Sequence, residues 1–147
     1  MNKSILLALF ASLCFVSCNS DDDSNNTDTN SIVGIWKMEK TFTISGQDNT
    51  SIIREYTPDD CKQRSTFEFN QNGKYILNDY NYINDECKHD QETINYTYNK
   101  TNNKLLLDNN ESTVLELTNN KLIIYVADNY DSNEDGVNDY IKYIFVK

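Results

Sequence analysis

The stretch from Ser31 to Ile44 constrains the fold of this chain most, because its largest side chains recur at the period of a β-strand. It holds the only tryptophan, Trp36, two residues after Gly34. A glycine lets another segment approach the backbone, and an indole two positions later can lie across that space. The residues on one face, interrupted only by Lys40, are Ile32, Gly34, Trp36, Met38, Phe42 and Ile44. We therefore predict a long, half-buried first strand whose large side chains point inward.

The rest of the chain has the same character. After Cys18 no segment has helical periodicity, and short runs of strand-forming residues alternate with polar turns. Gln71-Asn72-Gly73 is typical of a tight hairpin, whereas the residues around Cys87 are expected to form a polar loop. The further expected strands are residues 52–56, 65–69, 74–82, 92–98, 104–108, 112–117, 122–126 and 140–146. About eight strands in an up-and-down order predict an all-β fold, either a closed barrel or a two-sheet sandwich.

A first strand with Gly34-x-Trp36, followed only by hairpin-connected strands, resembles the lipocalin-like barrel family. The resemblance covers residues 31–147 and favours a single antiparallel up-and-down β-barrel of about eight strands. Two features depart from the family pattern. Its other two conserved blocks have no counterpart here, and no helix is expected after the last strand. The resemblance therefore implies a lipocalin-like domain and does not extend to the transport lipocalins.

Large apolar side chains from several strands are expected to line the barrel interior and to form the ligand-binding surface. In a small barrel such residues either fill the interior or leave room for one small ligand. The predicted interior residues are Trp36, Met38, Phe42, Phe67, Phe69, Tyr96, Leu115, Leu117, Ile124 and Val126.

Residues 1–17 have the features of a secretory signal peptide. Lys3 gives a positive start, and the apolar run of residues 5–11 is too short to span a bilayer. Ser17 directly before Cys18 resembles the lipobox of bacterial lipoproteins, in which the cysteine is diacylated and becomes the first mature residue. The resemblance implies a membrane partner reached through a lipid anchor on Cys18, since two or three acyl chains hold firmly. The alternative is ordinary signal cleavage with an incidental cysteine.

Residues 18–30 are expected to form an acylated, flexible, acidic tether, because no apolar residue follows the cysteine. Asp21, Asp22 and Asp23 resemble the surface-export signal of lipoproteins in the phylum Bacteroidota. This implies an outer-membrane lipoprotein of a Gram-negative-type bacterium, exposed at the cell surface. A plain solvated spacer and a periplasmic location are the alternatives.

Charge and composition argue against several functions. The formal net charge of −10 disfavours nucleic acid as a partner. His89 is the only histidine, and it is expected in a polar loop without the glycines of a nucleophile elbow. No pair of carboxylates stands apart in so acidic a chain, and no glycine-rich loop suits a phosphate. We predict that the protein is not an enzyme and has no cofactor other than a candidate calcium ion.

Cys61 and Cys87 are the only thiols that the mature chain keeps once Cys18 is acylated. An even pair in an oxidising compartment implies a disulfide. Its closure would stabilise the fold by about 3.5 kcal/mol on the chain-entropy model. A redox or metal pair would have CxxC spacing, and with His89 the two cysteines would form only a dispersed metal site.

The acidic stretch from Asp131 to Asp139 resembles the first half of an EF-hand-type loop and the acidic repeats of thrombospondin type 3. Oxygen side chains alternate ahead of Gly136, as hard oxygen ligands for calcium would. The expected ligands are the side chains of Asp131, Asn133, Asp135 and Asp139 and the carbonyl of Val137. The closing acid of such loops falls at Lys142 here, so a solvated acidic hairpin is the alternative.

These features predict a membrane-anchored, non-catalytic binding module for a small apolar molecule. The alternative function is that of a structural or interaction lipoprotein at the surface, with a packed and calcium-stabilised barrel. No residue pattern points to a particular protein partner.

Overall fold

A computed structural model describes residues 31–147. The predicted signal peptide, the acylated Cys18 and the tether lie outside the described residues. The described part consists of β-strands with one 3-10 helical turn. Its elements are β1 (Gly34–Ile44), β2 (Ile52–Tyr56), η1 (Lys62–Arg64), β3 (Thr66–Phe69), β4 (Lys74–Ile83), β5 (Glu86–Asn99), β6 (Lys104–Leu107), β7 (Asn110–Leu117), β8 (Lys121–Ala127) and β9 (Tyr140–Val146).

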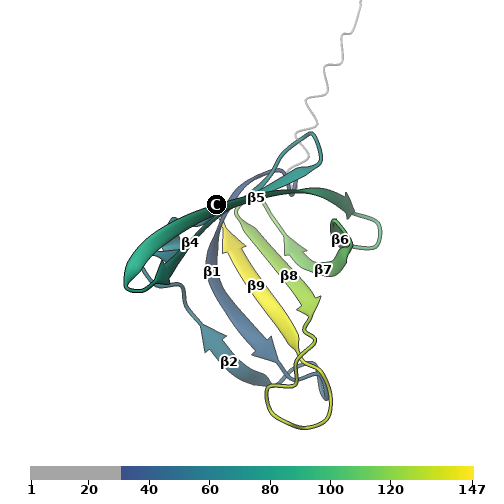
Figure 1. The fold of residues 1–147 in the computed structure, drawn as a ribbon. Coiled ribbons are helices and arrows are strands. Elements are labelled where there is room, and N and C mark those ends of the chain that lie inside the picture. Colours follow the sequence, from purple (N-terminus) through teal and green to yellow (C-terminus); the bar gives the residue numbers. More distant parts are fainter. Residues whose placement is uncertain (1–30) are drawn as a thin grey trace, which may run out of the picture.

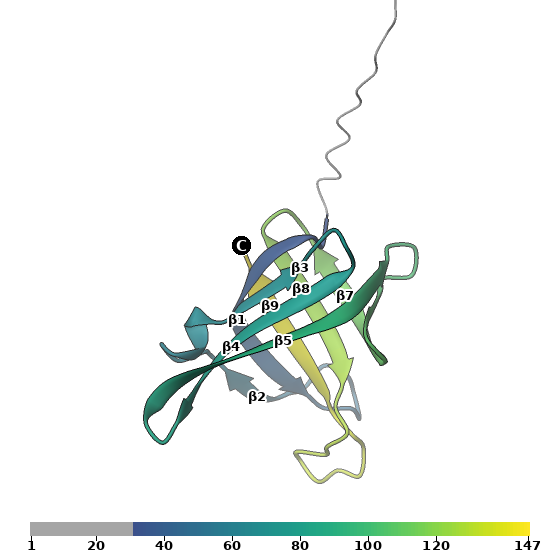
Figure 2. The ribbon, with the colours of Figure 1, turned by 45° about the horizontal axis from the view of Figure 1, so that its top comes forward.

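All the described strands except β2 form one closed antiparallel barrel, in the order β1-β3-β4-β5-β6-β7-β8-β9. The barrel closes because β9 pairs with β1 along residues 37–44. β3 pairs with the start of β1, and β2 is an additional strand that pairs with its end. In Figure 1, β2, β1, β9, β8 and β7 lie side by side, and Figure 2 shows β3, β4 and β5 crossing in front of β8 and β9. The predicted up-and-down barrel is confirmed, and the sandwich alternative is wrong.

The β4–β5 hairpin is longer than the sequence pattern predicted. Asn84 (φ 51°) and Asp85 (φ 63°) form its two-residue turn, a backbone conformation that asparagine and aspartate tolerate. β5 therefore begins at Glu86, and Cys87 pairs with Tyr82 across the hairpin. The predicted polar loop around Cys87 is wrong. Figure 2 shows the far end of this hairpin reaching beyond the barrel wall.

The predicted disulfide between Cys61 and Cys87 is confirmed, with 5.6 Å between the two Cα atoms. It ties the segment that contains η1 to the outer part of the β4–β5 hairpin. The Arg64 guanidinium lies 4.5 Å from the centre of the Tyr80 ring and donates a hydrogen bond of 3.4 Å to Cys87 Sγ. η1 therefore lies against β4 beyond the residues that pair with β3.

A β-bulge in β1 decides which side chains of its second half face the interior. Met38 lies opposite Phe145 and Lys40 opposite Ile144, so Glu39 is an extra residue. A bulge reverses the alternation along the rest of the strand. Phe42 consequently faces outward, and its predicted interior position is wrong.

A second bulge has the same effect in β7. Val114 lies opposite Ile124 and Glu116 opposite Ile123, so Leu115 is the extra residue. The Leu115 side chain is 55% exposed, and its predicted interior position is wrong. Val114 faces inward instead and belongs to the core.

Around Trp36 the barrel interior is filled. The Trp36 side chain is 0% exposed, and its Nε1 donates a hydrogen bond of 2.8 Å to the Ile32 carbonyl. Lys147 Nζ lies 4.4 Å from the centre of the indole. The buried cluster comprises Ile32, Trp36, Phe67, Phe69, Leu105, Val114, Leu122, Ile124 and Phe145. The inward-pointing tryptophan predicted from the sequence is thus part of a close-packed core.

Candidate functional site

Farther along the barrel axis than Trp36, the interior holds a cavity of about 370 Å³. This volume is within the usual range of small-molecule pockets, about 300–1,000 Å³. The residues that line it are Met38, Lys62, Phe67, Tyr75, Leu77, Asp79, Leu107, Ser112, Ile124, Val126 and Tyr143. Most of this surface is apolar or aromatic, and it comes from inward-facing positions of several strands.

The structure divides the predicted interior residues into three groups. Those that line the cavity are Met38, Phe67, Ile124 and Val126. Those that join or pack against the core cluster without reaching the cavity are Trp36, Phe69, Tyr96 and Leu117. Phe42 and Leu115 lie outside the barrel, for the reason given above.

Seven lining residues were absent from the prediction: the polar Lys62, Asp79 and Ser112, and the apolar or aromatic Tyr75, Leu77, Leu107 and Tyr143. Tyr75 and Leu77 alternate within a predicted strand, so the period-two pattern could have found them. Tyr143 could have been found in the same way. Tyr143 lies two residues before Phe145, so both side chains point to the same face of the last strand, and Phe145 belongs to the core.

One wall of the cavity is polar. Lys62 Nζ lies 2.5 Å from Asp79 Oδ1, and the same carboxylate accepts hydrogen bonds from Ser65 Oγ (3.1 Å) and Asn81 Nδ2 (2.7 Å). Burial raises the pKa of the Asp79 carboxyl, but the hydrogen bonds from Lys62, Asn81 and Ser65 and the positive charge of Lys62 together hold that pKa below its ordinary value. Asp79 is therefore charged at neutral pH and forms an ion pair with Lys62 at the cavity surface.

Two tyrosines, Tyr75 and Tyr143, are among the lining residues. Burial is the main cause that raises the pKa of both Tyr75 and Tyr143 above the ordinary value. Both phenols are therefore neutral at physiological pH. An apolar wall with a few polar groups is the usual composition of a small-molecule site.

A family described as a lipocalin-like domain matches residues 32–124, which is more than half of the chain. The chain belongs to this lipocalin-like domain family. The lipocalin fold typically binds small hydrophobic ligands and is in general a non-catalytic binding fold. The match ends within β8, so β9, which closes the barrel, lies beyond it.

Similar solved structures include lipocalins from mammals. The bovine odorant-binding protein in complex with undecanal is 15% identical, with a TM-score of 0.43, over 85% of this chain and 74% of that chain. A dog lipocalin allergen is 14% identical, with a TM-score of 0.42, over 80% of this chain and 74% of that chain. A comparison with curated proteins gives no match.

His89 lies in β5 of the lipocalin-like domain, and its predicted position in a polar loop is wrong. Its ring stacks on Tyr80 with 4.5 Å between the centroids, and its Nε2 lies 3.4 Å from Asn78 Oδ1. His89 is therefore held between the Tyr80 ring and the Asn78 amide on β4.

The acidic loop before β9 folds its carboxylates onto backbone N–H groups. Asp131 accepts hydrogen bonds from the N–H groups of Asp135 (3.2 Å) and Gly136 (2.7 Å). Asp139, which is 1% exposed, accepts them from Gly46 (3.3 Å) and Ser132 (2.6 Å). The bond from Gly46 ties the loop to the turn between β1 and β2, and the other three lie within the loop.

The predicted calcium ligands Asp131, Asn133 and Asp139 thus accept hydrogen bonds from backbone N–H groups. Within residues 31–147 no three His, Cys, Asp or Glu side chains lie close enough to hold a metal ion. Calcium binding stays a prediction, which melting curves of wild type and Asp131→Asn with and without millimolar calcium would test.

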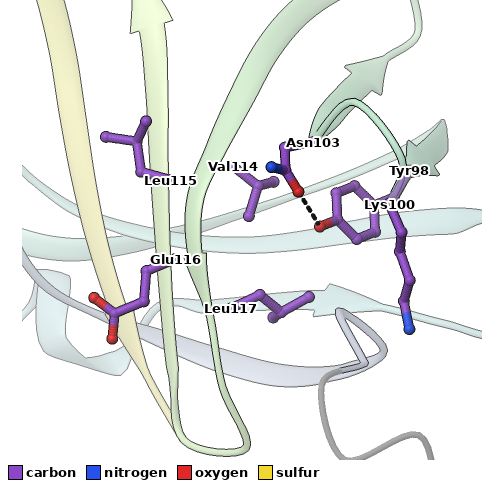
Figure 3. A pocket seen from close by; sticks show the side chains of 7 residues that line it. All are labelled: Tyr98, Lys100, Asn103, Val114, Leu115, Glu116 and Leu117. Carbon is purple, nitrogen blue, oxygen red and sulfur yellow. Dashed lines mark hydrogen bonds between the residues drawn. The ribbon is translucent and has the colours of Figure 1, made fainter.

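Two other hollows are separate from the barrel cavity. One has a volume of about 360 Å³ and lies where the turn after β5 meets the end of β7. In Figure 3, Val114 and Leu117 point toward Tyr98, whereas Leu115 and Glu116 point away from it. The other, which we call the outer groove, has a volume of about 460 Å³. It is lined by Phe42, Ile44, Asn49, Thr50, Ile52, Leu115, Tyr125 and Lys142.

A search of residues 31–147 for a helix long and apolar enough to cross a membrane finds none.

Proposed function

We propose that this protein is a membrane-anchored lipoprotein whose lipocalin-like domain binds a small apolar molecule in the barrel cavity. The observation that carries the proposal is the largely apolar cavity of about 370 Å³. Apolar burial contributes about 25 cal/mol per Å², so a ligand that loses a few hundred Å² of surface would bind with a roughly micromolar Kd. The ion pair of Lys62 and Asp79 and the hydroxyls of Tyr75 and Tyr143 would orient the polar end of such a ligand.

Filling the cavity should abolish binding. N-phenyl-1-naphthylamine, a dye that fluoresces in apolar surroundings, should bind the wild-type domain saturably with a roughly micromolar Kd. Val126→Phe places a ring in the cavity, and we expect binding to weaken about tenfold or more because the ligand and the ring compete for the same volume.

Leu115→Phe is the matched control, because it enlarges a side chain on the outside of the barrel. It should bind the dye like wild type, and melting curves should show that both variants are folded. Equal loss of binding in the two variants, or no saturable binding by wild type, would contradict the proposed site.

The membrane anchor is proposed on the lipobox-like Ser17-Cys18. Cys18→Ala should move the protein from the membrane fraction to the soluble fraction, because the tether has no other group that holds lipid. Cys14→Ala is the matched control and should leave the protein in the membrane fraction. A Cys18→Ala protein that still sediments with membranes and incorporates labelled lipid would show that the anchor is elsewhere.

We propose the outer face of the outer membrane as the location, on the basis of Asp21, Asp22 and Asp23 after the lipidated cysteine. Protease added to intact cells should then digest the domain. If only lysed cells yield digestion, the domain faces the periplasm.

The alternative is an interaction lipoprotein, and the outer groove favours it. Ile52 and Leu115 are 60% and 55% exposed, although they contribute to the apolar lining of this groove. If no apolar probe binds to the folded domain, this second function takes the place of the first.

A further inference from the structure

The rim of the barrel cavity is acidic on the side formed by β4 and β5. Tyr75, Leu77 and Asp79 alternate along β4 and all line the cavity. Their partners across the hairpin are Ile94, Glu92 and Asp90. Residues directly opposite each other in an antiparallel pair project to the same side of the sheet. Glu92 and Asp90 therefore extend the cavity wall outward as an exposed rim.

Asp90 and Asp79 face each other directly in the register. Like charges at such positions destabilise a sheet, so the pair is not explained by strand stability. A third carboxylate approaches from the opposite wall: Asp128 follows β8 and is close enough to Tyr143, a lining residue, to contribute to the raised pKa of its phenol. Glu92 and Asp79 act in the same way on Tyr75.

The positive charges of Lys62 and Lys88 on this side are already paired, and the Arg64 guanidinium lies over the Tyr80 ring, on the opposite face of β4 from Asp79. Lys62 contacts Asp79 at 2.5 Å and also donates to Asn81 Oδ1 at 3.1 Å. Lys88, farther out on β5, is paired with Glu86. The Lys62–Asp79 pair is neutral as a unit, which leaves Asp90, Glu92 and Asp128 to set the potential at the rim.

We propose that the cavity selects apolar molecules that carry an ammonium group over molecules of the same length that end in a carboxylate. The inference rests on the proposed function, and it names the chemical class of the ligand. An apolar tail would occupy the space between Met38, Leu77 and Ile124, and the ammonium group would lie at the rim near Asp90 and Glu92. A fatty acid would place its carboxylate beside the same groups and meet repulsion there.

Three probes of equal chain length test this: decylammonium, 1-decanol and decanoate, titrated against the domain at pH 7 by displacement of N-phenyl-1-naphthylamine. Uncompensated unit charges near a solvated rim change affinity by about tenfold. We expect decylammonium to bind about tenfold more tightly than decanoate, with 1-decanol between them. High salt should reduce this preference, because the rim is exposed to solvent.

The double variant Asp90→Asn, Glu92→Gln removes two of the rim charges without touching the ion pair of Lys62 and Asp79, and it should bring decylammonium and decanoate within about threefold of each other. The double variant Asp48→Asn, Glu111→Gln removes the same number of charges away from the cavity and should keep the wild-type preference. Failure of all three probes to displace the dye would overturn the proposed function itself. Two results would overturn only the inference about charge. In the first, 1-decanol binds, but decanoate binds as tightly as decylammonium or more tightly. In the second, the preference for decylammonium survives in the rim variant.

Discussion

Replacing Trp36 by alanine should lower the free energy of unfolding by about 3–5 kcal/mol, the largest loss expected from any single side chain of the barrel. The indole is 0% exposed and packs within the buried cluster, so its removal leaves a void that the surrounding strands cannot fill. The Ile32 carbonyl also loses its hydrogen bond from Nε1. Urea unfolding followed by circular dichroism would measure the change, since the variant has no tryptophan to report by fluorescence.

Phe42→Ala is the control, because the sequence pattern puts Phe42 on the same face as Trp36 and the structure puts it outside the barrel. It should cost far less than Trp36→Ala. A loss as large as that of Trp36→Ala would show that Phe42 points into the core and that the bulge at Glu39 is absent.

Removing the disulfide should cost about 3.5 kcal/mol, because the bond closes a loop between residues 26 positions apart and so restricts the unfolded chain. The test is the double variant Cys61→Ala, Cys87→Ala, which leaves no thiol within residues 31–147. The same loss should follow when wild type is reduced with dithiothreitol. We also expect the β4–β5 hairpin end to exchange its amide hydrogens faster, since the bond ties it to the segment around η1.

Dithiothreitol should leave the stability of the double variant unchanged, which separates reduction of this bond from other effects of the reagent. Equal stability of wild type and variant would mean that the bond does not form in the protein as isolated.

The fold could be predicted from the sequence because its determinants are local. Alternation at period two in residues 31–44 and 65–69, and the tight turn at Gly73, specify antiparallel strands wherever the chain goes. The disulfide followed from the number of cysteines. Even the overlooked turn at Asn84 and Asp85 has a local signal, because both residues tolerate positive φ.

The orientation of several side chains could not be predicted, because it depends on how distant strands align. Glu39 and Leu115 are bulge residues only in relation to β9 and β8, and no glycine or proline marks them in the sequence. One extra residue sends the later side chains of the strand to the opposite face, which is why Phe42 lies outside the barrel.

Sequence alone determined an all-β chain with a buried Trp36 and a paired Cys61 and Cys87. Only the tertiary structure decided the closed barrel, the cavity and its acidic rim. Asp79, Asp90 and Glu92 are unremarkable carboxylates in an acidic chain until the register of β4 and β5 places them on one side of the sheet. Register arises from backbone pairing and barrel closure over the whole molecule, and short-range patterns carry no information about it.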